Sequence, residues 1–174
     1  MRAKLILLAF LLDQFTKYLT IIYQPDLKFK GVGLLYSESK GYMLGLFMVV
    51  PYRRWLVILI MLFFLFMIQL LFRFYWRVFR RNRLTYMSFS FIVGGFLGNF
   101  MDCIISEYVI DIFRVPFVYA TNLADGFIFV GLGLLLLEFS INKNFWKTMF
   151  KLKPVKEELR LVRTFFKFPK FPRK

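Results

Sequence analysis

The sequence predicts an all-α integral membrane protein with four transmembrane helices and a small β-rich element on the outer surface. The chain of 174 residues is 59% hydrophobic and 21% aromatic, with a mean hydropathy of +0.61. This composition is more apolar than that of an ordinary soluble domain. The apolar residues also gather in four segments, each near the roughly 20 residues needed to cross a bilayer. Membrane insertion is therefore the starting interpretation.

The four predicted spans are residues 5–23, 55–72, 86–101 with an extension to about 105, and 123–139. The first follows Arg2 and Lys4, as a secretion signal would. It lacks a small-residue cleavage site and contains Asp13 and Lys17, so we expect it to remain as a helix. Residues 1–142 are then expected to form the membrane domain, and residues 143–174 a basic tail.

The charge pattern predicts that both termini are cytoplasmic. The formal net charge is +15, and most basic residues lie in the tail and in one block between the second and third spans, namely Arg73, Arg77, Arg80, Arg81 and Arg83. Such blocks mark cytoplasmic connections and attract anionic lipids. The tail is expected to be either an interfacial segment on the inner leaflet or a disordered basic anchor. No nucleic-acid-binding module is recognisable, so no nucleic-acid partner is expected.

Residues 24–54 are expected to be more than a simple loop. They mix glycine, aromatic residues and alternating polarity, which indicates short strands that form an outer, cradle-like element. In the third span, Gly94 and Gly98 have the spacing of small residues at a helix-packing face.

Residue counts exclude several kinds of site. The chain has one cysteine, Cys103, and no histidine. An intrachain disulfide, Ser-His-Asp or Cys-His catalysis and a His-ligated zinc site are therefore all excluded. Any acid–base chemistry must use Asp, Glu, Lys or Tyr, and neither a metal nor a cofactor is expected.

Polar residues inside the spans are expected to converge at one depth, near the outer face. With the predicted topology this set comprises Asp13, Lys17, Asn99, Asp102, Asn122 and Asp125, and Asp111 precedes the fourth span. Each charged group in a span costs at least about 2.5–3.5 kcal/mol. Taken singly, each residue has a structural explanation, such as an i, i+4 ion pair or a helix cap. Together they indicate a functional site.

Two close carboxylates, Asp111 and Asp125, could act as an acid–base pair. In a poorly solvated site one carboxyl keeps a proton, so that one can activate water while the other protonates a carbonyl oxygen. A proton-coupled transporter is an alternative use of buried acids. A relay should continue to the inner face, however, and Glu138 is the one acidic residue in the inner half of a predicted span.

Four motifs occur in order: DQFTK at 13–17, KGYMLGLF at 40–47, GGFLGNFMD at 94–102, and VID at 109–111 followed by NLAD at 122–125. In these motifs the chain resembles the bacterial lipoprotein signal peptidase (type II signal peptidase) family of integral-membrane aspartyl proteases. The resemblance implies that Asp111 and Asp125 are the catalytic pair. It implies further that Asn99, Asp102 and Asn122 position the pair and the substrate backbone, that Asp13 and Lys17 support them, and that Gly41 belongs to the outer cradle.

The resemblance also implies a substrate and an inhibitor. The substrate would be a diacylglyceryl-modified prolipoprotein, cleaved just before its lipid-modified cysteine at the outer face of the bacterial cytoplasmic membrane. The peptide antibiotic globomycin would be an inhibitor.

The chain departs from the family pattern at four positions. Ser39 stands where the family has asparagine, Leu44 and Thr121 where it has phenylalanine, and Cys103 where it has arginine. Loss of that arginine removes a charged donor toward the substrate. A catalytically silent relative that binds lipoprotein precursors is therefore the main alternative. Cys103 is expected to be a small buried packing residue, because no base partner for a nucleophile is evident.

Overall fold

The computed structural model describes residues 2–39, 54–79, 82–106, 108–115 and 118–142. Gly41 and Leu44 of the expected cradle, and the tail at 143–174, lie outside these ranges. Contacts divide the chain into two compact units, Met1–Glu138 and Phe139–Lys174, and the architecture below belongs to the first.

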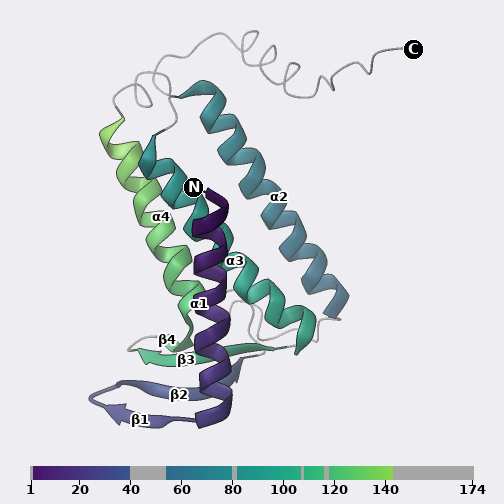
Figure 1. Ribbon diagram of the computed structural model, residues 1–174, viewed down its shortest axis with the longest axis vertical. Coiled ribbons are helices and arrows are strands. Elements are labelled where there is room, and N and C mark those ends of the chain that lie inside the picture. Colours follow the sequence, from purple (N-terminus) through teal and green to yellow (C-terminus); the bar gives the residue numbers. More distant parts are fainter. Residues whose placement is uncertain (1, 40–53, 80–81, 107, 116–117, 143–174) are drawn as a thin grey trace. The chain divides into compact units, whose positions relative to one another are not determined.

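Four long helices confirm the predicted spans (Figure 1). They are α1 (Arg2–Tyr23), α2 (Arg54–Val78), α3 (Arg83–Ile105) and α4 (Leu123–Ile141). The helix α2 continues six residues past the predicted end at 72, through Arg73 and Arg77. Arginine is a good helix former, and its long side chain can reach from an apolar helix surface to water. Hydropathy therefore detected the apolar part of this helix but missed its basic end.

The helix surfaces have the polarity of a protein that faces lipid. Phe15 on α1 is 58% exposed, whereas Asp13, two residues earlier, is fully buried. On α2, Phe63 and Phe66 are likewise more than half exposed. Because apolar side chains gain little from burial when the surroundings are hydrocarbon, the polar groups collect in the interior.

The helix α3 packs between α1 and α4 at glycine positions. A Cβ on Gly94 would lie 2.7 Å from the Cβ of Ala9 in α1, and one on Gly95 would lie 2.3 Å from the carbonyl oxygen of Ala124 in α4. Neither contact would be tolerated by a larger residue. The absence of side chains at these positions therefore permits the close backbone approach that brings three helices together.

A four-stranded antiparallel sheet lies at one end of the helices, where α1 and α3 end and α4 begins (Figure 1). Its strands, in spatial order, are β1 (Asp26–Phe29), β2 (Val32–Ser39), β3 (Val109–Val115) and β4 (Val118–Thr121). The first two confirm that short strands form within the connection at 24–54. The other two were not expected, because residues 106–122 read as a connection of mixed polarity.

Asp111 consequently lies in a strand rather than in an irregular loop. Residues Val109 to Ile112 are all buried, so β3 has no alternation of buried and exposed residues that would reveal a strand in the sequence. Its partner β2 is distant in the chain, and Ser37 is the residue directly opposite Asp111. This pairing gives Asp111 a defined backbone position.

At the opposite end of the helices, Glu138 is also buried. Its carboxylate accepts hydrogen bonds from the Tyr75 hydroxyl at 2.9 Å and from the side-chain amide of Asn82. Asn82 also caps α3, because its side-chain oxygen accepts from the backbone N–H of Thr85 at 2.9 Å. These bonds connect α2 and α4 to the start of α3 and give Glu138 a structural role.

Candidate active site

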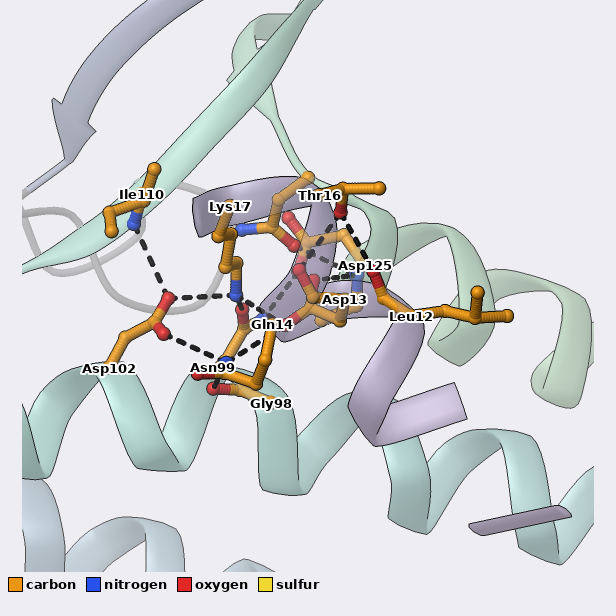
Figure 2. A network of polar contacts seen from close by, with 12 residues as sticks. Leu12, Asp13, Gln14, Thr16, Lys17, Gly98, Asn99, Asp102, Ile110 and Asp125 are labelled. Atoms are coloured by element: carbon orange, nitrogen blue, oxygen red, sulfur yellow. Dashed lines mark hydrogen bonds and ion pairs between the residues drawn. The ribbon is translucent and has the colours of Figure 1, made fainter. Parts of the chain in front are cut away.

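A buried ion cluster connects α1 with α3 (Figure 2). The Lys17 ammonium lies 2.7 Å from a carboxylate oxygen of Asp13 and 2.7 Å from one of Asp102. The three side chains are 0–4% exposed. The ion pair expected from the i, i+4 spacing of Asp13 and Lys17 is therefore present, and Asp102 joins it. A buried charge of this kind is tolerated only when it is paired and hydrogen-bonded.

Asp13 also binds the start of α4. One of its carboxylate oxygens accepts the backbone N–H of Ala124 at 2.8 Å, which is one of the amides left without an intrahelical partner in the first turn. A Cβ on Gly98 of α3 would lie 2.3 Å from the Asp13 carboxylate, so glycine is required there for Asp13 to reach α4. Asp13 thus joins three helices.

Lys17 also orients Asn99, which in turn binds Asp125. The Lys17 ammonium donates to the side-chain oxygen of Asn99 at 3.1 Å, and the Asn99 amide nitrogen donates to Asp125 at 2.8 Å. An ammonium group can only donate, so the Asn99 oxygen must face Lys17 and its NH₂ must face Asp125. The direction of the amide follows from this chemistry.

Asn122 connects the two predicted catalytic aspartates. Its side-chain oxygen accepts the backbone N–H of Asp125 at 3.0 Å and so caps α4, while its NH₂ group donates to Asp111 at 3.0 Å. Because a backbone N–H is also only a donor, this amide too has a single possible direction. Each aspartate therefore accepts one N–H from an asparagine whose orientation is determined by a third group.

Each aspartate also accepts a hydrogen bond from a hydroxyl group on its other carboxylate oxygen. Ser39 of β2 donates to Asp111, and Thr121 of β4 donates to Asp125 at 3.2 Å. Ser39 lies opposite Val109, two residues from Asp111 along β3, so the bond runs diagonally across paired strands. Sequence reasoning noted both residues as departures from the family pattern but did not place them at the carboxylates.

Asp111 lies where its charged form is disfavoured. Burial raises the pKa of the Asp111 carboxyl above its ordinary value of 3.8, and the negative charge of Asp125 raises it further. Hydrogen bonds from Ser39 and Asn122, and the charge of Lys17, act in the opposite direction. The raised pKa favours the protonated form of the Asp111 carboxyl.

Gln14 is a further member of the site that sequence reasoning did not identify. Its side-chain NH₂ contacts Asp102 at 3.1 Å, the carbonyl oxygen of Gly98 at 3.2 Å and Asp13 at 3.3 Å (Figure 2). The available signal was its place within the DQFTK motif. Asp102 additionally accepts the backbone N–H of Ile110 at 3.4 Å, which connects the ion cluster to β3.

Cys103 is buried, as expected of a packing residue. It is 1% exposed and belongs to a small apolar cluster with Val57 of α2 and Val109 of β3, against which Met61 packs. Within the described residues, no group of three or more His, Cys, Asp or Glu side chains could hold a metal ion.

An apolar cavity of about 340 Å³ opens beside the start of α4. Its lining comes from both sheet and helix and comprises Val32, Phe113, Val115, Thr121, Asn122, Leu123, Gly126 and Phe129. Thr121 and Asn122, which contact the two aspartates, thus border a space of apolar character.

Comparison with known proteins identifies the family. A sequence profile of the family described as Signal peptidase (SPase) II matches residues 5–141. The chain belongs to the signal peptidase II family. This confirms the family and the aspartic-type peptidase class expected from the motifs.

Relatives match along most of the chain. The lipoprotein signal peptidase of Caldicellulosiruptor bescii is 34% identical over 156 residues, which cover 86% of this chain and 97% of that protein. The lipoprotein signal peptidase of Halothermothrix orenii is 33% identical over 139 residues, covering 76% and 90%. A solved bacterial membrane enzyme has the same fold, with a TM-score of 0.65 at 18% identity over 82% of this chain and 90% of that one.

The structure brings together seven of the eight residues predicted for the site, in one connected set of contacts: Asp13, Lys17, Asn99, Asp102, Asp111, Asn122 and Asp125. The eighth, Gly41, lies outside the described residues. Asp13 and Lys17 come from the half of α1 nearer the sheet, and Asn99 and Asp102 from the end of α3. Asn122 and Asp125 come from the start of α4, and Asp111 from β3. The protein is thus a multi-pass membrane peptidase of the signal peptidase II family in which these seven residues gather toward the sheet.

Proposed function

We propose that this protein is an aspartyl endopeptidase of the bacterial cytoplasmic membrane that removes the signal peptide from diacylglyceryl-modified prolipoproteins. Asp111 and Asp125 form the catalytic pair, and cleavage occurs just before the lipid-modified cysteine. The observation that carries the proposal is the bridge through Asn122, which contacts both aspartates from the cap position that precedes α4. The lipoprotein signal peptidases to which the chain is similar support the substrate class.

In the proposed mechanism the pair holds one proton. The ionised carboxylate takes a proton from water, whose oxygen bonds to the scissile carbonyl carbon, while the protonated carboxyl donates to the carbonyl oxygen. Collapse of the resulting diol breaks the C–N bond and returns a proton to the leaving amine. The amide contacts from Asn99 and Asn122 orient both carboxylates for these transfers.

The proposed location follows from charge and polarity. The sheet and the aspartate pair lie at the end of the helices away from the basic connection between α2 and α3, which is expected to be cytoplasmic. The site then faces the outer side, where a precursor anchored by its diacylglyceryl group can approach from the membrane. The apolar cavity beside Thr121 suits an apolar part of such a substrate.

The test is a cleavage assay with the purified protein, a lipid-modified precursor peptide and lipid–detergent micelles. We expect globomycin-sensitive cleavage before the modified cysteine, with Asp111→Asn and Asp125→Asn each lowering kcat by about 10²–10⁴-fold. Asp26→Asn is the matched control, since Asp26 is an exposed acid of β1 and should leave the rate unchanged.

Two results would contradict the proposal. Wild-type activity in both variants of the pair would show that these aspartates do not act in cleavage. Precursor binding without cleavage, under conditions in which a relative is active, would instead indicate a catalytically silent member of the family.

A further inference from the structure

The hydroxyl groups of Ser39 and Thr121 differ from the asparagine amides in what they can do. The two amide NH₂ groups, from Asn99 and Asn122, can only donate, so each suits a carboxylate oxygen that carries no proton. A hydroxyl group can donate or accept. Ser39 and Thr121 contact the second oxygen of Asp111 and of Asp125, respectively.

The amides cannot reverse to accept a proton. The Asn99 oxygen faces the Lys17 ammonium, and the Asn122 oxygen faces the backbone N–H of Asp125, so both oxygens are occupied by groups that only donate. Neither amide can therefore present its oxygen to an aspartate without losing that bond. A proton on either aspartate is best accommodated on the oxygen that faces a hydroxyl.

We propose that Ser39 and Thr121 are positioning residues that keep Asp111 and Asp125 aligned in both protonation states. When the carboxyl is ionised the hydroxyl donates to it, and when the carboxyl is protonated the hydroxyl rotates and accepts. This inference rests on the proposed function, because only an acid–base cycle requires each aspartate to gain and lose a proton. Both residues stand at positions where the chain departs from the family pattern.

The surroundings of Asp111 define what else influences its titration. The charged groups around it are Asp125 from α4, Lys17 from α1, Asp102 from α3 through the adjacent Ile110 N–H, and Glu38, an exposed residue of β2. The Ser39 hydrogen bond offsets part of the increase in the pKa of Asp111. Loss of that hydroxyl should therefore raise this pKa further.

The test measures kcat, KM and the pH profile of precursor cleavage. We expect Ser39→Ala and Thr121→Val each to lower kcat about tenfold, with KM changed less than about twofold, because one hydrogen bond to a charged group is lost. In Ser39→Ala the limb of the pH profile that reports ionisation of Asp111 should move to higher pH. The hydroxyl-retaining variants Ser39→Thr and Thr121→Ser should keep near-normal kcat.

Matched controls remove hydroxyls elsewhere. Ser90→Ala and Thr20→Val each delete a buried hydroxyl that bonds a backbone carbonyl one turn earlier in its own helix, and both should keep normal kinetics. The two test residues come from different strands, so if one variant does not fold, the other still measures the effect.

The outcomes separate this inference from the proposed function. An unchanged kcat and pH profile in Ser39→Ala and Thr121→Val, with Asp111→Asn inactive, would overturn the inference alone. So would a change in KM only, or a loss that the hydroxyl-retaining variants do not restore. Full activity of Asp111→Asn would instead overturn the proposed function.

Discussion

The two asparagine side chains in the site are oriented by groups that can only donate hydrogen bonds. Lys17 and the backbone N–H of Asp125 are donors, and they determine the direction of Asn99 and Asn122. Those amides in turn donate to the two aspartates. Among the described residues, no buried side-chain nitrogen or oxygen is without a hydrogen-bond partner. In a low-dielectric interior such complete pairing makes the geometry rigid.

Removing the buried cation should be far more damaging than removing an exposed one. Lys17→Met leaves Asp13 and Asp102 buried without their shared partner, so we expect a loss of about 3–5 kcal/mol in unfolding free energy. Lys28→Met is the control, because Lys28 forms a 3.2 Å pair with Asp26 in which both side chains are more than half exposed. It should cost under about 1 kcal/mol. Unfolding in mixed micelles measures both, and equal losses would contradict the prediction.

The raised pKa of Asp111 should make stability depend on pH. The folded protein holds a proton that the unfolded chain releases at the ordinary pKa of 3.8. Stability from this group is therefore full below 3.8 and is lost as pH rises through the raised folded value. We expect the midpoint temperature of unfolding to fall as pH rises through that window in the wild type, and to fall less in Asp111→Asn. The same dependence of the midpoint on pH in both proteins would contradict this prediction.

Among the secondary-structure elements, α3 determines how closely the other helices approach. Gly94 and Gly98 face α1, whereas Gly95 faces the start of α4. This places Asn99 between Lys17 and Asp125, and Asp102 against Lys17. Small residues on two sides of one helix thus position polar groups that come from three helices.

Gly95→Ala should destabilise the protein, because the new Cβ would lie 2.3 Å from the carbonyl oxygen of Ala124. We expect a loss of about 1–3 kcal/mol, the usual range for overpacking. Gly133→Ala on α4 is the control, since its Cβ would meet nothing within 4 Å. Thermal unfolding in detergent measures the stability of the two variants. If α3 and α4 pack as described, Gly95→Ala should be less stable than Gly133→Ala by more than the experimental error.

For the whole molecule, the basic blocks predict the orientation in the membrane. The arginine block that runs from the end of α2 to the start of α3 and the tail at 143–174 should remain cytoplasmic. Each cationic side chain near the anionic leaflet should contribute about 1 kcal/mol. Both termini would then lie inside, with the sheet outside.

Cysteine labelling in intact spheroplasts tests this orientation. Lys28→Cys on β1 should react with a membrane-impermeant thiol reagent, whereas Lys174→Cys should react only after permeabilisation. The wild type, whose single Cys103 is 1% exposed, supplies the unlabelled control. Labelling at position 174, but not at position 28, in intact spheroplasts would contradict the proposed topology.

The amino-acid sequence by itself determined the class of the protein and most members of the site. Four apolar segments predicted four helices, because burial in hydrocarbon depends on local composition. The i, i+3 and i, i+4 spacings predicted which polar residues share a helix face, because helix geometry is also local. The motifs then indicated the family.

Only the tertiary structure decided how the carboxylates are surrounded. Asp111 lies in a buried strand whose partner is far away in sequence, and Ser39 reaches it across 72 positions of the chain. Gln14 reaches Asp102 across 88 positions. Contacts of this kind depend on strand register and on which helix packs at each glycine face, and neither hydropathy nor spacing encodes these. For this reason Ser39 and Thr121 are mere departures from a motif in the sequence, but hydrogen-bond partners of the aspartate pair in the folded protein.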